Sequence, residues 1–287
     1  MKVVLAGAYG KLGGCILTSL VKAGHEVVAA DLMERDIEGL DKSKVTFKKL
    51  DVTNKDALKG ICDGASAVIT TVGLTRKSDK LTNYDIDFQG NLNLLNEAKS
   101  AGVKNFVYIS VIKADLCKDA PMVHAKYLFE EELKKSGLTY VIHRPTGYMY
   151  DIVKVFKPMV EKGEVTLLGK KDYSCNVVDC PDFGDFIVEH MLDNNKTYNV
   201  GGKETYTYRE IAEMCFKAMG KEAVIKTAPV FLFNVLASLP KNKKNGTAAM
   251  IRFSKFTLTH DLIGDTVVGN TSFKEFVNES LGGKNNA

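Results

Sequence analysis

The sequence lacks the features that mark disulfide-rich, membrane-spanning and nucleic-acid-binding proteins. Its six cysteines include no C-x-x-C pair, and in a chain of 287 residues we expect them to be reduced, mostly buried thiols. No run of eighteen or more apolar residues is present, so no membrane-spanning helix is predicted. The formal net charge is only +4, without a long basic block, so nucleic acid is not an expected partner.

Repeats, metal-ligand clusters and targeting segments are missing as well. His190 and His260 have no partners at ligand spacing, so no metal is predicted. The first apolar strand begins at residue 2, which leaves no room for a targeting segment ahead of it, and a cytoplasmic location is expected. With 45% hydrophobic and 26% charged residues, the chain can bury a full core and form two lobes.

The most informative segment that is present is the first one, MKVVLAGAYGKLGG. An apolar run suited to a buried strand leads into Gly7-x-x-Gly10-x-x-Gly13, and apolar residues at helical spacing follow. Such a turn lets backbone N–H groups and the positive end of a helix approach a pyrophosphate. The segment therefore predicts a dinucleotide-binding site, against the alternative of a β-α-β unit with an ordinary tight turn.

Asp31 indicates which dinucleotide is bound. It ends a second apolar strand, 18 residues after Gly13, close to the spacing of the acid that holds the adenosine ribose. A carboxylate accepts hydrogen bonds from ribose hydroxyls but repels a 2′-phosphate, which an Arg or Lys would accommodate. NAD is therefore predicted in preference to NADP.

Strand and helix patterns alternate along the first half of the chain. Continuous apolar strands separated by helices predict an α/β fold, a doubly wound parallel (Rossmann) sheet covered on both faces. Strands are expected at 45–50, 67–72, 106–110 and 140–143, and helices at 56–62, 85–101 and 121–136. The strand at 140–143 is expected to be broken by Arg144-Pro145.

Beyond Pro145 the pattern is looser. Helices are expected at 151–162, 182–192 and 208–219, with extended segments at 164–168 and 198–200. We therefore predict a nucleotide-binding domain over 1–146, with return elements from about 176–202. An irregular lobe over 147–287 would mainly bind the substrate.

One apolar stretch, 229–239, has two interpretations. It is followed by Pro240 and by Lys241, Lys243 and Lys244. The favoured interpretation is a helix that packs its apolar face on the substrate lobe. The alternative is a surface helix that brings residues 229–244 into contact with membrane headgroups.

Several local patterns, in this order along nearly the whole chain, resemble the extended and atypical branches of the short-chain dehydrogenase/reductase superfamily. The overall pattern resembles the NmrA-like group, which includes isoflavone-reductase-like and divinyl-chlorophyllide-reductase-like proteins. The matching segments are Gly7-x-x-Gly10-x-x-Gly13, Asp51-Val52, Thr71-Val72-Gly73, Asn93–Ala98, Ala101–Val103, Phe106–Ser110, Lys126, Ser136–Tyr140, Arg144-Pro145, Gly201-Gly202 and Thr207–Ala212.

The resemblance implies a set of cofactor-binding residues in addition to the three glycines and Asp31. By the part of the nucleotide they would contact, these are Tyr9, Lys11 and Leu12 (pyrophosphate), Asp51 and Val52 (adenine), Thr71, Val72 and Gly73 (inner ribose), Lys126 (nicotinamide ribose), and Pro145 and Thr146 (nicotinamide pocket).

The sequence departs from the family pattern at the expected catalytic tyrosine. Reductases of the superfamily carry Tyr-x-x-x-Lys, but the residue four before Lys126 is Met122, and a thioether cannot transfer a proton. Lys126, Tyr148 and Ser110 are the remaining catalytic candidates. Tyr148 and Tyr150 have a second interpretation, as an amphipathic wall of an apolar pocket.

Two histidines near these candidates have simpler interpretations. His124 should point to another side of the helix that carries Lys126, and His143 should be a core histidine with satisfied ring nitrogens.

The resemblance implies an NAD(P)-dependent oxidoreductase that moves a hydride to or from a small apolar carbonyl or activated alkene. The alternative is a non-catalytic regulator or scaffold that senses NAD(P), as the loss of the tyrosine would predict. An isomerase or dehydratase with transiently reduced NAD is a third possibility, but such enzymes usually keep the tyrosine.

Overall fold

A computed structural model describes residues 1–75, 78, 80–240 and 246–282 of the chain. It divides into two compact units. Unit 1 comprises Met1–Arg144 and Cys180–Tyr198, and unit 2 comprises Pro145–Asp179 and Asn199–Ala287.

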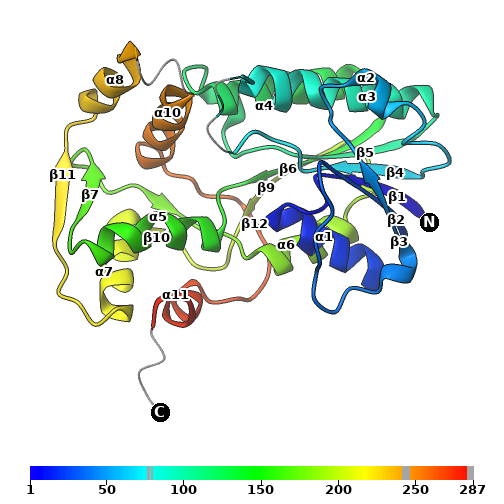
Figure 1. Cartoon of the computed structure of the whole chain (residues 1–287). Coiled ribbons are helices and arrows are strands. Elements are labelled where there is room, and N and C mark those ends of the chain that lie inside the picture. The colour runs from blue at the N-terminus through cyan, green and yellow to red at the C-terminus, as the bar shows by residue number, and fades with distance from the viewer. Residues whose placement is uncertain (76–77, 79, 241–245, 283–287) are drawn as a thin grey trace. The chain divides into compact units, whose positions relative to one another are not determined.

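Unit 1 is built from parallel strands and the helices between them (Figure 1). Its strands are β1 Lys2–Ala6, β2 Glu26–Asp31, β3 Val45–Lys49, β4 Ala67–Thr70, β5 Asn105–Ile109 and β6 Thr139–Pro145, with β9 Lys196–Gly201 at the boundary with unit 2. Its helices are α1 Lys11–Lys22, α2 Lys55–Leu58, α3 Asn91–Ser100, α4 Pro121–Lys135 and α6 Cys180–Glu189, together with short 3-10 turns η1 Lys42–Lys44 and η3 Ala114–Leu116 and the π-helix η2 Tyr84–Gly90.

The eight-stranded sheet has the order β12-β9-β6-β5-β4-β1-β2-β3, where β12 is Thr266–Val267. From β1, strands β2 and β3 are added on one side, and β4, β5 and β6 are added on the other. The point at which the strand order reverses therefore lies between β1 and β4. Ligands of doubly wound sheets bind outside the carboxyl ends of the strands at this point. The predicted α/β fold with a doubly wound parallel sheet is confirmed.

Apolar strand residues form the core of unit 1 because helices cover both faces of the sheet. Helices α1 and α6 lie on one face, and α2, α3 and α4 lie on the other (Figure 1). Val3, Val4 and Leu5 are fully buried between these layers. Close packing of α1 on α6 depends on Gly184, because a Cβ there would lie 3.0 Å from the backbone of Cys15.

Two expected elements differ from the structure. The predicted helix at 85–101 is in fact the π-helix η2 followed by α3, and η2 packs against α4. The strand predicted to break at Arg144-Pro145 continues through both residues, because Pro145 is the last residue of β6 and needs no ladder donor there.

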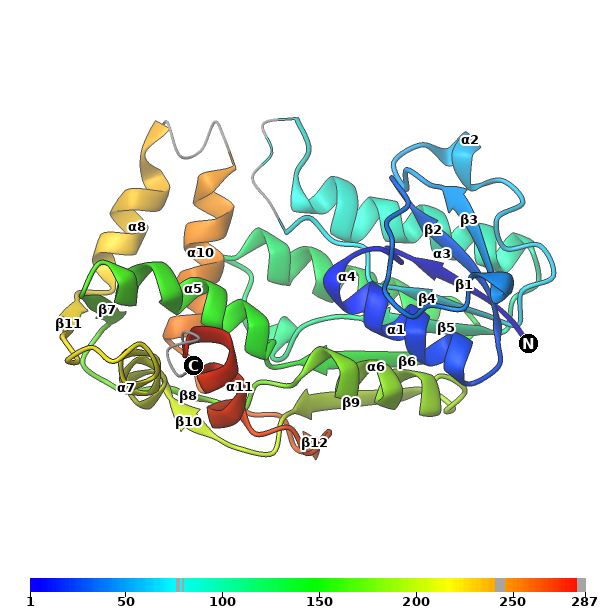
Figure 2. The same ribbon diagram turned by 60° about the horizontal axis from the view of Figure 1, so that its bottom comes forward.

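Unit 2 is mainly helical, with short strand pairs. Its helices are α5 Met149–Glu161, α7 Tyr208–Ala218, α8 Phe231–Ser238, α10 Thr247–Leu258 and α11 Phe273–Leu281; its strands are β7 Val165–Leu168, β8 Ser174–Cys175, β10 Tyr206–Thr207 and β11 Ile225–Ala228. Helices α5, α7 and α11 pack together, β7 pairs with β11, and α8 lies beside α10 (Figure 2). Helix α7 starts at a capping box formed by Thr207 and Glu210.

The favoured interpretation of the apolar stretch at 229–239 is wrong. Helix α8 buries only Ala237, whereas Phe231 is 61% exposed and Val235 is 52% exposed. Helix α8 packs beside α10 (Figure 2), and this contact leaves most of its apolar side chains exposed. The lysines 241, 243 and 244 lie outside the described residues.

The chemistry of the cysteines and the absence of a membrane span agree with the sequence. All six cysteines are free thiols, and Cys62, Cys175, Cys180 and Cys215 are buried. Among the residues that the structure describes, no helix has both the length and the apolarity needed to cross a bilayer.

Candidate functional site

The three glycines of the predicted turn have three different environments. Gly7 has φ +78°, which favours glycine, and a Cβ there would lie 2.5 Å from the Thr71 hydroxyl. A Cβ on Gly13 would lie 1.9 Å from the carbonyl oxygen of Gly7. A Cβ on Gly10 would meet only that same oxygen, at 3.4 Å, and Gly10 is exposed. The fold itself therefore requires glycine at 7 and 13 but not at 10.

The start of α1 lies at this turn and has no side-chain cap. Gly10 is the N-cap, with extended backbone, and no side chain accepts a hydrogen bond from the first turn there. The first turn also contains no acidic residue. Because the N-terminus of a helix carries partial positive charge, this end suits an anion that approaches over Gly10.

Asp31 connects the end of β2 to the turn. Its Oδ2 accepts a hydrogen bond from the Tyr9 N–H at 2.8 Å, and its Oδ1 accepts one from the Leu32 N–H at 2.7 Å. The carboxylate is therefore held in place by backbone donors beside the turn. Tyr9 itself is buried, with its ring edge against Phe47, and burial followed by the charge of Glu34 raises the pKa of its phenol.

The predicted adenine residues lie after β3. Asp51 is exposed and its Oδ1 accepts hydrogen bonds from the N–H and hydroxyl of Thr53. Val52 is buried beneath Gly90, where a Cβ would come within 2.6 Å of its methyl group. Leu12, predicted to lie beside the pyrophosphate, is buried in α1, and Lys11 is exposed next to it.

The segment after β4, Thr71 to Gly73, contacts the glycine turn at one end and Lys126 of α4 at the other. The Thr71 hydroxyl lies 3.1 Å from the carbonyl oxygen of Gly7, so it fixes the turn. The Val72 N–H donates to the Thr70 hydroxyl. A Cβ on Gly73 would lie 2.7 Å from Asp87 Oδ1 and 3.4 Å from Lys126 Nζ, so glycine leaves space beside this ion pair.

Lys126 is held by three groups from two elements, η2 and β5. Its Nζ lies 3.4 Å from Oδ1 of Asp87 in η2, donates to the Ile109 carbonyl oxygen at 3.2 Å and lies 5.3 Å from the centre of the Tyr108 ring. The Lys126 side chain is 14% exposed and that of Asp87 is 1% exposed. Buried charges of this kind are stable only in pairs, so Asp87 balances and positions the ammonium group.

Buried polar atoms that make no hydrogen bond occur in this ion pair and on both neighbours of Ile109, whose carbonyl oxygen Lys126 bonds. Within the described part of the chain, Asp87 Oδ1, the Tyr108 hydroxyl and Ser110 Oγ are buried and have no hydrogen-bond partner. Burial and the nearby carboxylates of Asp87 and Glu130 raise the pKa of Tyr108 well above its ordinary value. Since buried polar groups are nearly always bonded, this cluster suits a polar ligand.

The other predicted residues of the nicotinamide end belong to unit 2. Pro145 ends β6, and Thr146 is buried with its hydroxyl donating to the Asn176 carbonyl oxygen and its N–H to that of Val200. Tyr148 is the N-cap of α5 and its ring stacks on Tyr150 at 5.7 Å. These contacts give Thr146 a structural role and give Tyr148 a rigid aromatic neighbour.

Asp87 and Tyr108 were not predicted from the sequence. The only signal in the sequence was that Asp87, like Asp85, is a carboxylate within a segment that otherwise predicts a helix. His143 differs from expectation as well: it is fully buried, but both ring nitrogens lack a partner among the described residues because Phe183, Phe186 and Tyr198 surround it. Burial lowers its pKa to about 3. His124 bonds the hydroxyl of Tyr84 in η2 at 3.0 Å.

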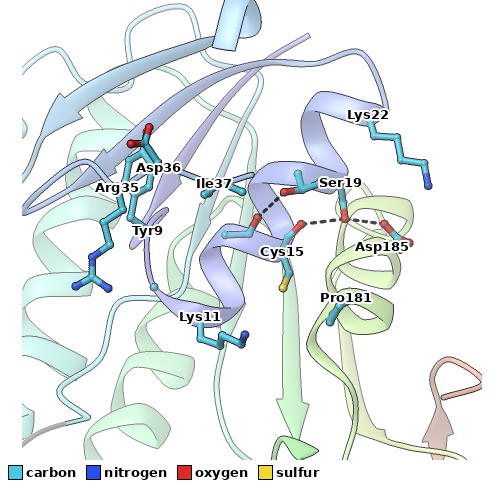
Figure 3. Close-up of a pocket in the computed structure, with 13 residues that line it drawn as sticks. Tyr9, Lys11, Cys15, Ser19, Lys22, Arg35, Asp36, Ile37, Pro181 and Asp185 are labelled. Carbon is cyan, nitrogen blue, oxygen red and sulfur yellow. Dashed lines mark hydrogen bonds between the residues drawn. The ribbon is translucent and has the colours of Figure 1, made fainter. Parts of the chain in front are cut away.

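A pocket of about 600 Å³ runs along the outer face of α1 (Figure 3). Tyr9 lies beside Arg35 and Asp36 at one end, and the Ser19 hydroxyl bonds Asp185 of α6 at 2.6 Å at the other. This pocket shares only Tyr9, Gly10 and Lys11 with the predicted cofactor residues, so it borders the predicted site and does not coincide with it.

Comparison with known proteins gives several relatives, among them an assembly factor and a reductase. A photosystem II assembly factor, Ycf39 from Synechocystis sp., is 26% identical over 244 residues, which cover 84% of this chain and 74% of that protein. The divinyl chlorophyllide a 8-vinyl-reductase of Arabidopsis thaliana is 28% identical over 276 residues, covering 84% of this chain and 64% of that protein.

Solved structures share the fold. An NADPH-dependent quinone oxidoreductase from Escherichia coli, complexed with NADPH, superposes with a TM-score of 0.75 at 20% identity over 98% of this chain and 99% of that chain. The model of the NmrA-like family matches residues 1–268. With nearly the whole sequence matched, this chain belongs to the NmrA-like family.

Proposed function

We propose that the protein is an NAD-dependent oxidoreductase that moves a hydride to or from a small apolar carbonyl compound or activated alkene. The observation that carries the proposal is Gly10, whose missing side chain is not required by the fold and leaves space at the uncapped start of α1. A pyrophosphate is the anion that such a turn accepts. The activities of similar proteins, a vinyl reductase and a quinone oxidoreductase, support this class of reaction.

Residues near the carboxyl ends of the strands would bind the two halves of a nicotinamide dinucleotide. Asp31 would accept the adenosine ribose hydroxyls and repel a 2′-phosphate, which favours NAD. Lys126 and its partner Asp87 would bind the hydroxyls of the nicotinamide ribose, and the Ser110 hydroxyl, which has no partner among the described residues, would donate to the reacting carbonyl. When bound, the cofactor supplies the hydride chemistry, while the protein orients it and excludes water.

The proton of the reaction must come from a group other than residue 122, which is Met. Lys126 is the proposed donor, because its ammonium is held in place by Asp87 and the Ile109 carbonyl. Tyr148 is a second proposed donor, and Ser110 is proposed to orient the substrate oxygen. If Lys126 is the donor, Lys126→Met should abolish NADH-dependent turnover. If Lys126→Met is still active and Tyr148→Phe is inactive, Tyr148 is the proton donor instead.

The binding step is tested with Gly10→Ser. Serine is a favoured N-cap residue, so the variant should remain as stable as the wild type, but its side chain occupies the proposed phosphate position. Calorimetric titration with NADH should show affinity reduced by about tenfold or more. Gly14→Ala is the matched control, since its Cβ meets only Ile37 at 3.4 Å and should leave binding unchanged.

The choice of cofactor has its own test. Asp31→Arg should weaken NADH binding and increase NADPH binding, because the guanidinium accepts a 2′-phosphate. If the wild type binds NADPH more tightly than NADH, the choice of NAD is wrong even though the dinucleotide site is retained.

A second candidate function, an NAD(P)-sensing scaffold, is favoured by Met122 and by the similarity to Ycf39, a photosystem II assembly factor. The two candidates differ in one measurement. A scaffold should bind NADH without consuming it in the presence of quinones, enones and aldehydes, whereas the oxidoreductase should oxidise NADH with at least one of these acceptors.

A further inference from the structure

Helix α8 has a surface that a soluble helix would normally bury. It is apolar nearly all round, yet four of its eight residues, Phe231, Leu232, Val235 and Leu236, are between 39% and 61% exposed. Leu239 directly after it is 44% exposed. Helices with apolar residues on every face are normally covered by protein or lipid.

The neighbouring helix continues this surface and adds positive charge. Helix α10 packs beside α8 (Figure 2), and the Lys255 ammonium donates to the Asn234 side chain at 2.9 Å. Met250 is 37% exposed and Arg252 is exposed on α10. Apolar and cationic side chains therefore occur together on one pair of helices, which we call the α8–α10 pair.

The sequence around the pair contains no negative charge. From 223 to 260 there is no Asp or Glu, while the same stretch holds six Lys or Arg residues. This is unusual in a chain with 35 acidic and 39 basic residues. Of the described cations in this stretch, Lys226 is paired with Glu164 of unit 2, and Arg252 and Lys255 lie on α10.

We propose that the α8–α10 pair docks on the surface of an anionic lipid membrane, with the apolar side chains of α8 among the headgroups and the cations of α10 on lipid phosphates. Exposed aromatic and aliphatic residues next to Lys and Arg, without acidic residues, are the pattern of helices that lie in a bilayer interface. A protein partner with a dry apolar groove would not require an acid-free stretch. The proposal is independent of the oxidoreductase function.

The test is cosedimentation of the full-length protein with vesicles of phosphatidylcholine, with and without phosphatidylglycerol. The wild type should sediment with the anionic vesicles and much less with neutral ones, and added salt should release it. Phe231→Ser/Val235→Ser should lower the partition coefficient by about tenfold or more. Arg252→Gln/Lys255→Gln should lower it by about tenfold on anionic vesicles only.

Leu116→Ser provides the matched control, because Leu116 is 64% exposed in unit 1 and should not affect sedimentation. Unchanged thermal melting shows that each variant is folded. The proposal is overturned if the wild type stays in the supernatant, if Phe231→Ser/Val235→Ser binds as the wild type does, or if Leu116→Ser binds as weakly as that double variant. Self-association that the α8 variant abolishes, without vesicle binding by the wild type, would show that a second copy covers the pair.

Discussion

Two regions lie at the carboxyl ends of the strands in unit 1: the glycine turn after β1, and the surroundings of Lys126 at the end of β5. They differ in how completely their polar groups are hydrogen-bonded. At the glycine turn, both oxygens of Asp31 accept backbone N–H groups and Thr71 bonds the turn carbonyl. Around Lys126, the buried hydroxyls of Tyr108 and Ser110 have no hydrogen-bond partner among the described residues, and Asp87 Oδ1 has only its ion pair with Lys126. The side chains of the first end are bonded within the fold, and those of the second are only partly bonded. We call them the complete and the incomplete end, and we expect substitutions at the first to affect mainly stability and those at the second to affect chemistry as well.

The largest effect is expected at the complete end, from Gly13→Ala. The new Cβ would lie 1.9 Å from the Gly7 carbonyl oxygen, and neither backbone can move without opening the turn. The free energy of unfolding in urea should fall by about 4 kcal/mol or more. Gly14→Ala, one position along the same helix, should instead be neutral or stabilising by up to about 1 kcal/mol. Equal losses in the two variants would contradict this account of the turn.

At the incomplete end, Lys126→Met removes the cation from a carboxylate that is 1% exposed. The unpaired Asp87 should lower the free energy of unfolding by about 3 kcal/mol. In the double variant Asp87→Asn/Lys126→Met the buried charge is gone, and about 2 kcal/mol of that loss should be recovered. Additive losses, measured by chemical denaturation at neutral pH, would show that the two side chains do not interact.

The next effect is a pH dependence from His143, whose carbonyl oxygen accepts the Ser110 N–H and whose ring has no polar partner among the described residues. Its pKa is about 3 in the fold and 6.5 ordinarily, so between these values the unfolded chain binds a proton that the folded chain does not. Acidification from pH 6.5 to 4.5 should therefore lower the free energy of unfolding by about 2 to 3 kcal/mol. His143→Phe should remove this part of the slope, and His124→Gln should keep it.

The smallest effect is expected from Thr71→Val, which removes the hydrogen bond to the Gly7 carbonyl oxygen. The variant should lose about 1 kcal/mol of unfolding free energy and should bind NADH somewhat more weakly, because the turn is less rigid. Thr18→Val is the comparison, since the Thr18 hydroxyl bonds only the exposed Gly14 carbonyl within α1. A larger loss in Thr18→Val would mean that the turn does not depend on Thr71.

Local features of the chain predicted the complete end. Gly7, Gly13 and Asp31 belong to one strand, turn, helix and strand in sequence, so their spacing alone brings them together. The incomplete end was predicted only in part. Lys126 was identified through the family pattern, but Asp87 lies 39 residues earlier, in a π-helix whose widened turn has no signal in apolar periodicity.

By itself, the sequence determined the parallel α/β fold, the glycine turn after β1 and the missing tyrosine at Met122, because each depends on residue type and short spacing. Only the tertiary structure decided that Asp87 meets Lys126, that the ring of His143 is enclosed by aromatic side chains and that α8 stays exposed. These depend on which distant segments pack together, and packing is selected by the shape and area buried across the whole fold.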